Sequence, residues 1–150
     1  MNTPPLGYDV GRGFLAVASG WFLAQTTKII LGVIREKRFN FRWFVSTGGM
    51  PSTHTAAVSS LCTFVGFYCG FLSIEFAMSL TFSLIIMFDA AGVRRNVGKQ
   101  AFVLNQIIDD IYAKREVAET RLKELLGHTP IEVFVGAAIG SLTVIAMWQK

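Results

Sequence analysis

Four long apolar segments alternate with polar stretches along this chain. The apolar segments occupy residues 13–34, 55–74, 76–93 and 131–148. Each is close to the roughly 20 apolar residues that a helix needs to cross the hydrocarbon of a bilayer. Residues 35–54 and 94–129 lie between them and carry most of the charged side chains. The pattern predicts a single domain over residues 1–150, an all-α integral membrane bundle of about four transmembrane helices.

The second polar stretch has a helical period of its own. Val97, Ala101, Leu104, Ile108 and Ile111 recur every three or four residues, and charged residues fill the positions between them. This spacing is typical of an amphipathic helix that lies outside the membrane. The period weakens after Ile111, so we expect the helix to break there.

Two of the apolar segments contain glycines four residues apart. The pairs are Gly66 with Gly70 and Gly136 with Gly140. Small residues at this spacing let the backbones of membrane helices approach closely, although such pairs are also common by chance. The second and fourth segments are therefore predicted to offer faces for close helix packing.

Composition supports the membrane interpretation. Hydrophobic residues make up 52% of the chain, which includes 13 Phe and has a mean hydropathy of +0.48, values that are unusual for a soluble domain. The net charge of +4 does not indicate nucleic acid, because the basic residues lie beside apolar segments, where they set membrane topology. Cys62 and Cys69 lie about 10 Å apart on one predicted helix, which is too far for a disulfide.

Four alternating crossings place both polar stretches on the same side of the membrane. Residues 35–42 carry four Lys and Arg and residues 94–123 carry seven, which together make eleven of the fourteen in the chain. Arg12 and Lys150 lie on the opposite side. By the positive-inside rule, the side with the polar stretches is the cytoplasm.

Two short motifs in these stretches share one composition. Residues 48–54 read Gly-Gly-Met-Pro-Ser-Thr-His and residues 127–130 read Gly-His-Thr-Pro, and each motif precedes an apolar segment. Glycine permits close backbone approach, and the N–H groups at a helix start attract anions. The first motif therefore predicts a phosphate site, with an ordinary loop and Ser52 as the helix N-cap as the alternative.

Basic residues and both histidines are predicted to gather at the same membrane face. They are Lys28, Arg35, His54, Arg94, Arg95 and His128. Arginine and lysine match phosphate oxygens. A histidine with a pKa near 6.5 can exchange protons at neutral pH or attack phosphorus as the neutral imidazole. Lys28 has a second interpretation as an anchor whose ammonium snorkels to the membrane surface.

These residues resemble the type 2 phosphatidic acid phosphatase superfamily, which is related to the vanadium-dependent haloperoxidases, and most closely its divergent branch of small bacterial and plant proteins. The superfamily motifs are Lys-x6-Arg-Pro, Pro-Ser-Gly-His and Ser-Arg-x5-His-x3-Asp. Lys28-x6-Arg35, residues 51–54 and His128-x3-Glu132 match them in order. Residues 48–52, 89–95 and 125–128 resemble short sequence segments that are characteristic of the divergent branch.

The resemblance implies a phosphatase that works through a phosphohistidine, without a metal ion or other cofactor. His128 is then the nucleophile, Glu132 orients it, and His54 protonates the leaving group. Phosphate oxygens are held by Lys28, Arg35, Ser52, Thr53 and nearby backbone N–H groups. The implied substrate is a lipid or isoprenoid phosphate or diphosphate in the cytoplasmic leaflet of the bacterial inner membrane.

The chain departs from the superfamily pattern at three positions. Glu36 stands in place of the proline of the first motif. Thr53 replaces a glycine whose N–H approaches the phosphate, and Leu122 replaces the arginine of the third motif. We predict Arg94 or Arg95 as the substitute for this arginine, because both follow the third apolar segment on the same side of the membrane.

Some alternatives stay open at this point. Thr129 and Glu132 ahead of an apolar run also form a capping box, with Pro130 at the favoured first position, so Glu132 is either a cap or the partner of His128. The departures allow a non-catalytic protein that binds or transports phospholipid, and the long cytoplasmic helices allow a structural subunit of a membrane complex. Four crossings form a thin enclosure, which favours a homodimer.

Overall fold

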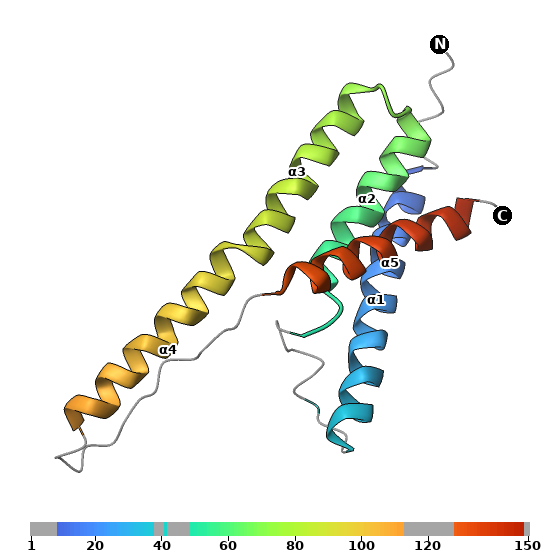
Figure 1. The fold of residues 1–150 in the computed structure, drawn as a ribbon. Coiled ribbons are helices and arrows are strands. Elements are labelled where there is room, and N and C mark those ends of the chain that lie inside the picture. The colour runs from blue at the N-terminus through green and yellow to red at the C-terminus, as the bar shows by residue number, and fades with distance from the viewer. Residues whose placement is uncertain (1–8, 38–40, 42–48, 113–127, 149–150) are drawn as a thin grey trace.

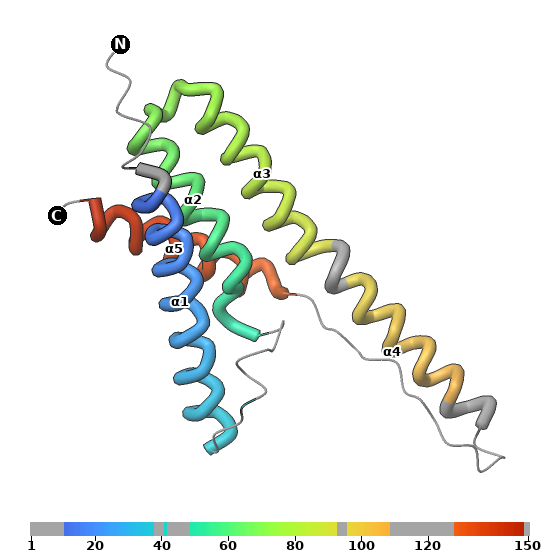
Figure 2. Tube along the Cα trace, turned by 180° about the vertical axis from the view of Figure 1, so that it is seen from behind, coloured from blue at the N-terminus to red at the C-terminus, as the bar shows by residue number. Residues whose placement is uncertain are grey.

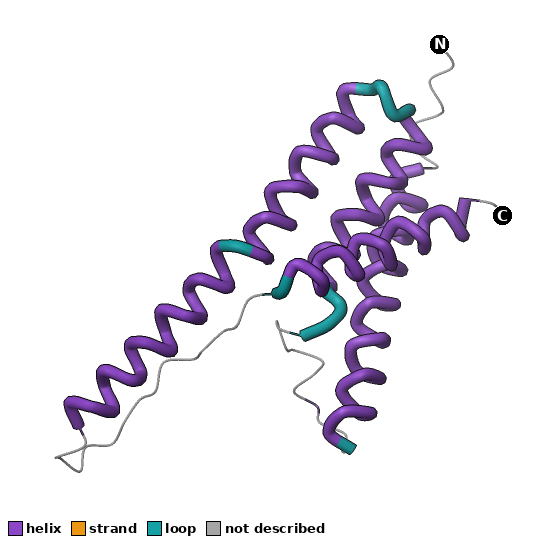
Figure 3. The backbone as a smooth tube through the Cα atoms, viewed as in Figure 1, coloured by secondary structure: helices purple, strands orange, loops and turns teal. Residues whose placement is uncertain are grey.

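The structure is a computed structural model that describes residues 9–37, 41, 49–112 and 128–148. The described residues form helices and short loops and contain no strand, so the prediction of an all-α membrane bundle is confirmed (Figures 1 and 3). The helices are α1 (Asp9–Glu36), α2 (Thr53–Cys69), α3 (Ile74–Ala91), α4 (Val93–Tyr112) and α5 (Pro130–Trp148). The central helix is α2, which packs against α1, α3 and α5.

The second helix is shorter than the apolar segment that predicts it. Gly70 ends α2 with a φ of 95°, a conformation that glycine adopts without steric cost, and its N–H donates to the Gly66 carbonyl at 3.1 Å. Ser73 then caps α3 by accepting from the Phe76 N–H at 3.1 Å. The segment at 55–74 therefore contains a helix end, a turn and the start of the next helix.

Within the described part of the chain, three helices are long and apolar enough to cross a membrane. They cover Gly11–Glu36, Ile74–Ile108 and Pro130–Trp148. The helix of the second predicted crossing, α2, has 17 residues, which is about 26 Å at 1.5 Å per residue and less than the roughly 30 Å of a hydrocarbon core. The prediction of four crossings stays a prediction, whereas the central place of α2 in the bundle is a feature of the structure.

The surface and interior of the bundle have the polarity expected in lipid. Large apolar side chains are exposed on every membrane-length helix, among them Phe14, Phe22, Ile85 and Phe134. The buried face of α2 carries mostly small and hydroxyl side chains: Thr53, Thr55, Ala56, Ser59, Ser60, Cys62, Phe64 and Gly66. A water-soluble protein would cover such large apolar patches, whereas a bilayer solvates them. The exposed side chains therefore indicate a membrane environment.

Small residues allow the close contact of α1, α2 and α5. The Ser60 hydroxyl of α2 donates to the carbonyls of Ala56 at 2.8 Å and of Gly140 in α5 at 3.1 Å. A Cβ on Gly20 of α1 would overlap the same hydroxyl, and one on Gly136 would overlap the carbonyl of Ser52. The close packing predicted for the Gly136 and Gly140 pair is confirmed, because helix backbones meet where neither residue has a side chain.

Substitution of Gly140 by alanine is expected to lower the free energy of unfolding by about 1–3 kcal/mol, the usual cost of overpacking. A Cβ there would lie 2.9 Å from the Ala56 carbonyl carbon and 3.0 Å from its Cα, and backbone cannot move aside as a side chain can. Thermal unfolding in detergent measures the change. Gly11→Ala is the matched control, since nothing lies within 4 Å of its added Cβ and alanine favours helix; equal melting temperatures for the two variants would contradict this account.

The helices α3 and α4 form one nearly straight rod that leaves the rest of the bundle (Figures 1 and 2). Helical hydrogen bonding continues through their junction, because the Gly92 N–H donates to the Phe88 carbonyl at 2.8 Å and the Gly92 carbonyl accepts from Asn96 at 3.0 Å. The helix predicted from the apolar period is present as α4, which the structure describes as far as Tyr112, and the predicted break after Ile111 stays a prediction. The rest of the second polar stretch, at 113–127, lies outside the described residues.

Candidate functional site

Hydrogen bonds between backbone groups bring the two short motifs together at one end of the bundle. The Ser52 N–H, just before α2, donates to the Glu132 carbonyl in α5 at 3.1 Å. The His128 N–H, just before α5, donates to the Ala90 carbonyl at the end of α3, also at 3.1 Å. Helix ends leave backbone groups without intrahelical partners, and these bonds satisfy them across elements. The starts of α2 and α5 are therefore joined to each other and to the end of α3.

His128 and Glu132 form a buried pair. The imidazole is 1% exposed, and its Nδ1 lies 3.1 Å from Oε2 of Glu132, which is 19% exposed. An ionised carboxylate can only accept, so Nδ1 carries the proton. In the neutral ring the basic lone pair is then on Nε2. The pair has the arrangement of an oriented nucleophile or base.

The same carboxylate oxygen also caps α5. Oε2 of Glu132 accepts from the Thr129 N–H at 3.0 Å, and the Thr129 hydroxyl accepts from the Glu132 N–H at 3.4 Å. This is the reciprocal arrangement of a capping box. The sequence left the cap and the partner of His128 as alternatives, and the geometry shows that one oxygen serves both. The cap holds the carboxylate in the position where it meets the imidazole.

Lys28 lies inside the bundle rather than on its surface. The side chain is 6% exposed and follows Gly20 and Ala24 along the buried face of α1. Glu132 is close enough for its charge to act on the Lys28 ammonium. An ammonium inside a membrane protein is expensive unless a carboxylate or carbonyl compensates it. Burial therefore favours the site interpretation of Lys28 over the snorkelling one.

Gln25 is a buried polar residue that the sequence motifs do not single out. It lies three residues before Lys28 on α1 and is also 6% exposed. Residues three apart in a helix share a face, so both polar groups point to the same side of the helix. The signal in the sequence is the polar band of residues 25–28 inside an apolar segment, although no motif identifies Gln25 as its buried member.

Ser52 is the N-cap of α2, which is the alternative that the sequence allowed for it. Its hydroxyl accepts from the Thr55 N–H at 3.4 Å and the Thr55 hydroxyl at 3.0 Å, and the residue is fully buried. Thr53 is buried as well. Gly49, at the start of the described motif, has a φ of 89°, where glycine is favoured over residues with a Cβ. The motif therefore forms the start of α2, and the Ser52 hydroxyl is used to cap this helix.

The other predicted site residues are less closely placed by the structure. His54 has an exposed side chain in the first turn of α2, and Arg35 is exposed two turns beyond Lys28. Arg94 and Arg95 begin α4, but their side chains lie outside the described part of the molecule. The structure therefore joins Ser52, Glu132 and His128 through hydrogen bonds and places Lys28 within electrostatic reach of Glu132. Among the described residues, no group of three His, Cys, Asp or Glu side chains could hold a metal ion.

Comparisons with known proteins found a family model and a relative that match this chain. A family model with the description "Divergent PAP2 family" matches residues 11–143. The uncharacterized membrane protein YuiD of Bacillus subtilis (strain 168) is 41% identical over 135 residues, which covers 83% of this chain and 85% of that protein. No solved structure matches the chain. The matched range contains both histidine motifs, and the protein therefore belongs to the divergent PAP2 family of membrane proteins.

Proposed function

We propose that this protein is a membrane phosphatase that hydrolyses a lipid or isoprenoid phosphate or diphosphate through a phosphohistidine. The observation that carries the proposal is the pair of His128 and Glu132, in which a buried imidazole has its Nδ1 held by a carboxylate. Such a partner fixes the tautomer and stabilises the positive charge that forms when the ring attacks. Lys28 adds a buried ammonium that interacts electrostatically with Glu132.

The chemistry proceeds in two displacements. Nε2 of His128 attacks phosphorus, the new P–N bond forms, and the P–O bond to the leaving group breaks. His54 gives a proton to the leaving oxygen and then, as the neutral base, takes a proton from a water molecule. That water attacks the phosphohistidine and breaks the P–N bond, which releases inorganic phosphate and restores the neutral imidazole. Atoms and protons balance over the cycle.

Basic side chains and the start of α2 stabilise the negative charge on the phosphate. Lys28 and Arg35 neutralise phosphate oxygens, and the N–H groups in the first turn of α2 donate to others. Arg94 or Arg95 takes the place of the arginine that Leu122 replaces. Support comes from the bond between the His128 N–H and the Ala90 carbonyl, because Arg94 follows Ala90 by only four residues, about 6 Å along a helix.

The position of the residues supports a lipid substrate. Ser52 and His128 immediately precede α2 and α5, so they lie near the level of the headgroups when these helices cross the membrane, whereas Lys28 lies about 12 Å along α1 before its end at Glu36. The positive-inside rule assigns this level to the cytoplasmic leaflet of the bacterial inner membrane. A homodimer remains our prediction for the assembly, since a second copy would thicken the enclosure around the site.

One observation favours a second candidate, a non-catalytic phospholipid-binding or transport-related protein. His128 is 1% exposed and the Ser52 hydroxyl is engaged in its cap, so a substrate reaches the imidazole only after local rearrangement. A binder uses the cations near the surface and needs no such access. The two candidates differ in one measurable species, the phosphohistidine.

Phosphate release by the purified full-length protein tests the proposal. The panel contains phosphatidate, phosphatidylglycerophosphate and a prenyl diphosphate in detergent micelles, each with a metal chelator. We expect inorganic phosphate from at least one substrate and, after acid-free quenching, an acid-labile phosphate on His128. Saturable binding with neither release nor labelling would overturn the phosphatase and leave the binder.

A further inference from the structure

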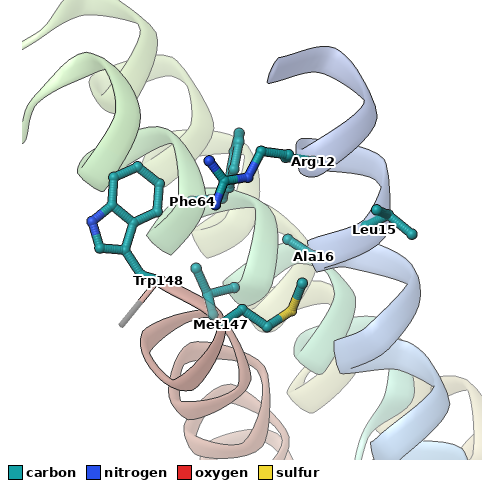
Figure 4. A pocket seen from close by; sticks show the side chains of 7 residues that line it. Arg12, Leu15, Ala16, Phe64, Met147 and Trp148 are labelled. Atoms are coloured by element: carbon teal, nitrogen blue, oxygen red, sulfur yellow. The ribbon is translucent and has the colours of Figure 1, made fainter. Parts of the chain in front are cut away.

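A cavity of about 90 Å³ lies near the start of α1 and the end of α5 (Figure 4), at the other end of α5 from the candidate site. Its walls come from the first turns of α1, from Phe64 of α2 and from the last two turns of α5. They include Arg12, Leu15 and Ala16 from α1 and Val144, Met147 and Trp148 from α5. None of these residues has a role in the proposed phosphatase reaction, so the cavity is separate from the candidate site.

The length of α1 places this cavity at a membrane surface. Arg12 precedes Lys28 by 16 residues and Arg35 by 23, which is about 24 Å and 35 Å along the helix. A hydrocarbon core is about 30 Å thick, so Arg35 at one headgroup level puts Arg12 at the other. Trp148 at the end of α5 fits the same level, where tryptophan is enriched.

The walls combine a cationic rim with an apolar floor. Ala16, Phe64 and Val144 form a buried apolar cluster beneath the cavity, whereas Arg12, Leu15 and Met147 are exposed at its edge. The Arg12 guanidinium carbon lies 6.0 Å from the centroid of the Trp148 ring. A cation–π contact uses the face of the guanidinium and leaves the N–H groups at its edge for an oxyanion. The Arg12 guanidinium at the rim can therefore bind a phosphate, and the apolar residues below it can contact a hydrocarbon chain.

The size of the cavity limits what enters it. On this measure one water molecule needs about 10–15 Å³, so 90 Å³ admits about six to nine groups of that size, far fewer than a whole phospholipid contains. The phosphate of a lipid is expected at the mouth against Arg12, because the other lining side chains are largely apolar. A few methylenes of an acyl chain fit the apolar interior. The shape selects an amphiphile whose charge stays outside.

We propose that this cavity binds one phospholipid of the leaflet opposite the candidate catalytic site, with its phosphate on Arg12 and methylenes of one chain against Ala16 and Val144. A single basic residue near the membrane surface favours an anionic over a zwitterionic headgroup by about five-fold. The lipid would contact both α1 and α5 at the end of the bundle away from the candidate site. The proposal does not depend on the phosphatase activity, since the two sites are about 24 Å apart along α1.

Native mass spectrometry of the full-length protein in detergent tests this site. The protein is titrated with phosphatidylglycerol or with phosphatidylcholine of identical chains. We expect one retained phosphatidylglycerol, bound about five-fold more tightly than phosphatidylcholine. In Arg12→Gln the preference disappears, and in Arg12→Lys it persists because the charge remains.

Two further variants separate this site from general attraction to the surface. Lys37→Gln removes the same charge from an exposed position at the other end of α1 and should leave retention unchanged. Met147→Trp fills the rim and should weaken retention of both lipids. Retention of phosphatidylglycerol by Arg12→Gln at the wild-type level would overturn the headgroup contact. Unchanged retention by Met147→Trp would overturn the chain contact, and no retention by the wild-type protein would overturn both.

Discussion

His128→Ala is expected to reduce phosphate release by on the order of 10⁴-fold or more and to abolish the acid-labile phosphoenzyme. Loss of a nucleophile removes the covalent route entirely, and what remains comes from substrate binding and charge stabilisation. Since the imidazole is 1% exposed, its removal also leaves a cavity. Release of inorganic phosphate under single-turnover conditions measures the chemical step without interference from product dissociation.

Controls for this variant distinguish chemistry from folding. The backbone bond between the His128 N–H and the Ala90 carbonyl needs no side chain, so the connection between α3 and α5 survives the substitution. His128→Asn keeps a polar side chain of similar size and should be equally inactive with a near-native melting temperature. His54→Ala should differ from these variants. Its rate should be partly restored with a substrate that has a good leaving group, because such a group needs less protonation. Wild-type rates of phosphate release by His128→Asn would exclude His128 as the nucleophile.

Glu132→Gln is expected to lower kcat by at least about 10²-fold with a small change in KM. The amide can present its NH₂ group to Nδ1, and the ring then carries its proton on Nε2, which is no longer nucleophilic. Even with its oxygen toward the ring, the amide lacks the negative charge that stabilises the imidazolium. Because Oε2 serves both partners, the capping bond to the Thr129 N–H at 3.0 Å survives when the amide oxygen takes that position and is lost when the NH₂ group takes it. Steady-state kinetics show whether the loss lies in kcat.

The matched control is Thr129→Val, which disturbs the cap and leaves the carboxylate in place. It removes the hydroxyl that accepts from the Glu132 N–H at 3.4 Å, and we expect a loss of about 0.5–2 kcal/mol in unfolding free energy with kcat nearly unchanged. Glu132→Ala combines both defects. If Glu132→Gln and Thr129→Val lost activity and stability in the same proportion, Glu132 would be only a helix cap.

Local features of the sequence predict much of the fold. The apolar segments, the amphipathic period after Val97 and the capping residues depend on neighbours within a few turns, and each corresponds to a helix or a helix end in the structure. The boundary at Gly70 is the exception in the second segment. An apolar run does not reveal where a chain turns, because a turn between two membrane-facing helices is also apolar.

Candidate site residues are predicted less completely than the helices. The motifs identify His128, Glu132 and Ser52, and a polar band in an apolar segment points to Lys28. The exposure of His54 is not readable from its motif, since a shift of one residue on a helix turns a side chain by about 100°. Whether a side chain faces the interior depends on which helices pack against it.

Composition, helical period and motif spacing are local properties of the chain, and they establish the all-α membrane character of the protein, its family and the residue types at its candidate site. Packing between helices is what lets one oxygen of Glu132 serve both the α5 cap and the imidazole, buries Lys28 within electrostatic reach of Glu132, and leaves a cavity under Arg12 at the other end of the bundle. These features arise where helices distant in sequence meet. Their positions depend on how closely α1, α2 and α5 approach. The spacing of Gly136 and Gly140 indicates one face for close packing, but the packing of the whole bundle decides which helices meet at Gly20 and Gly140.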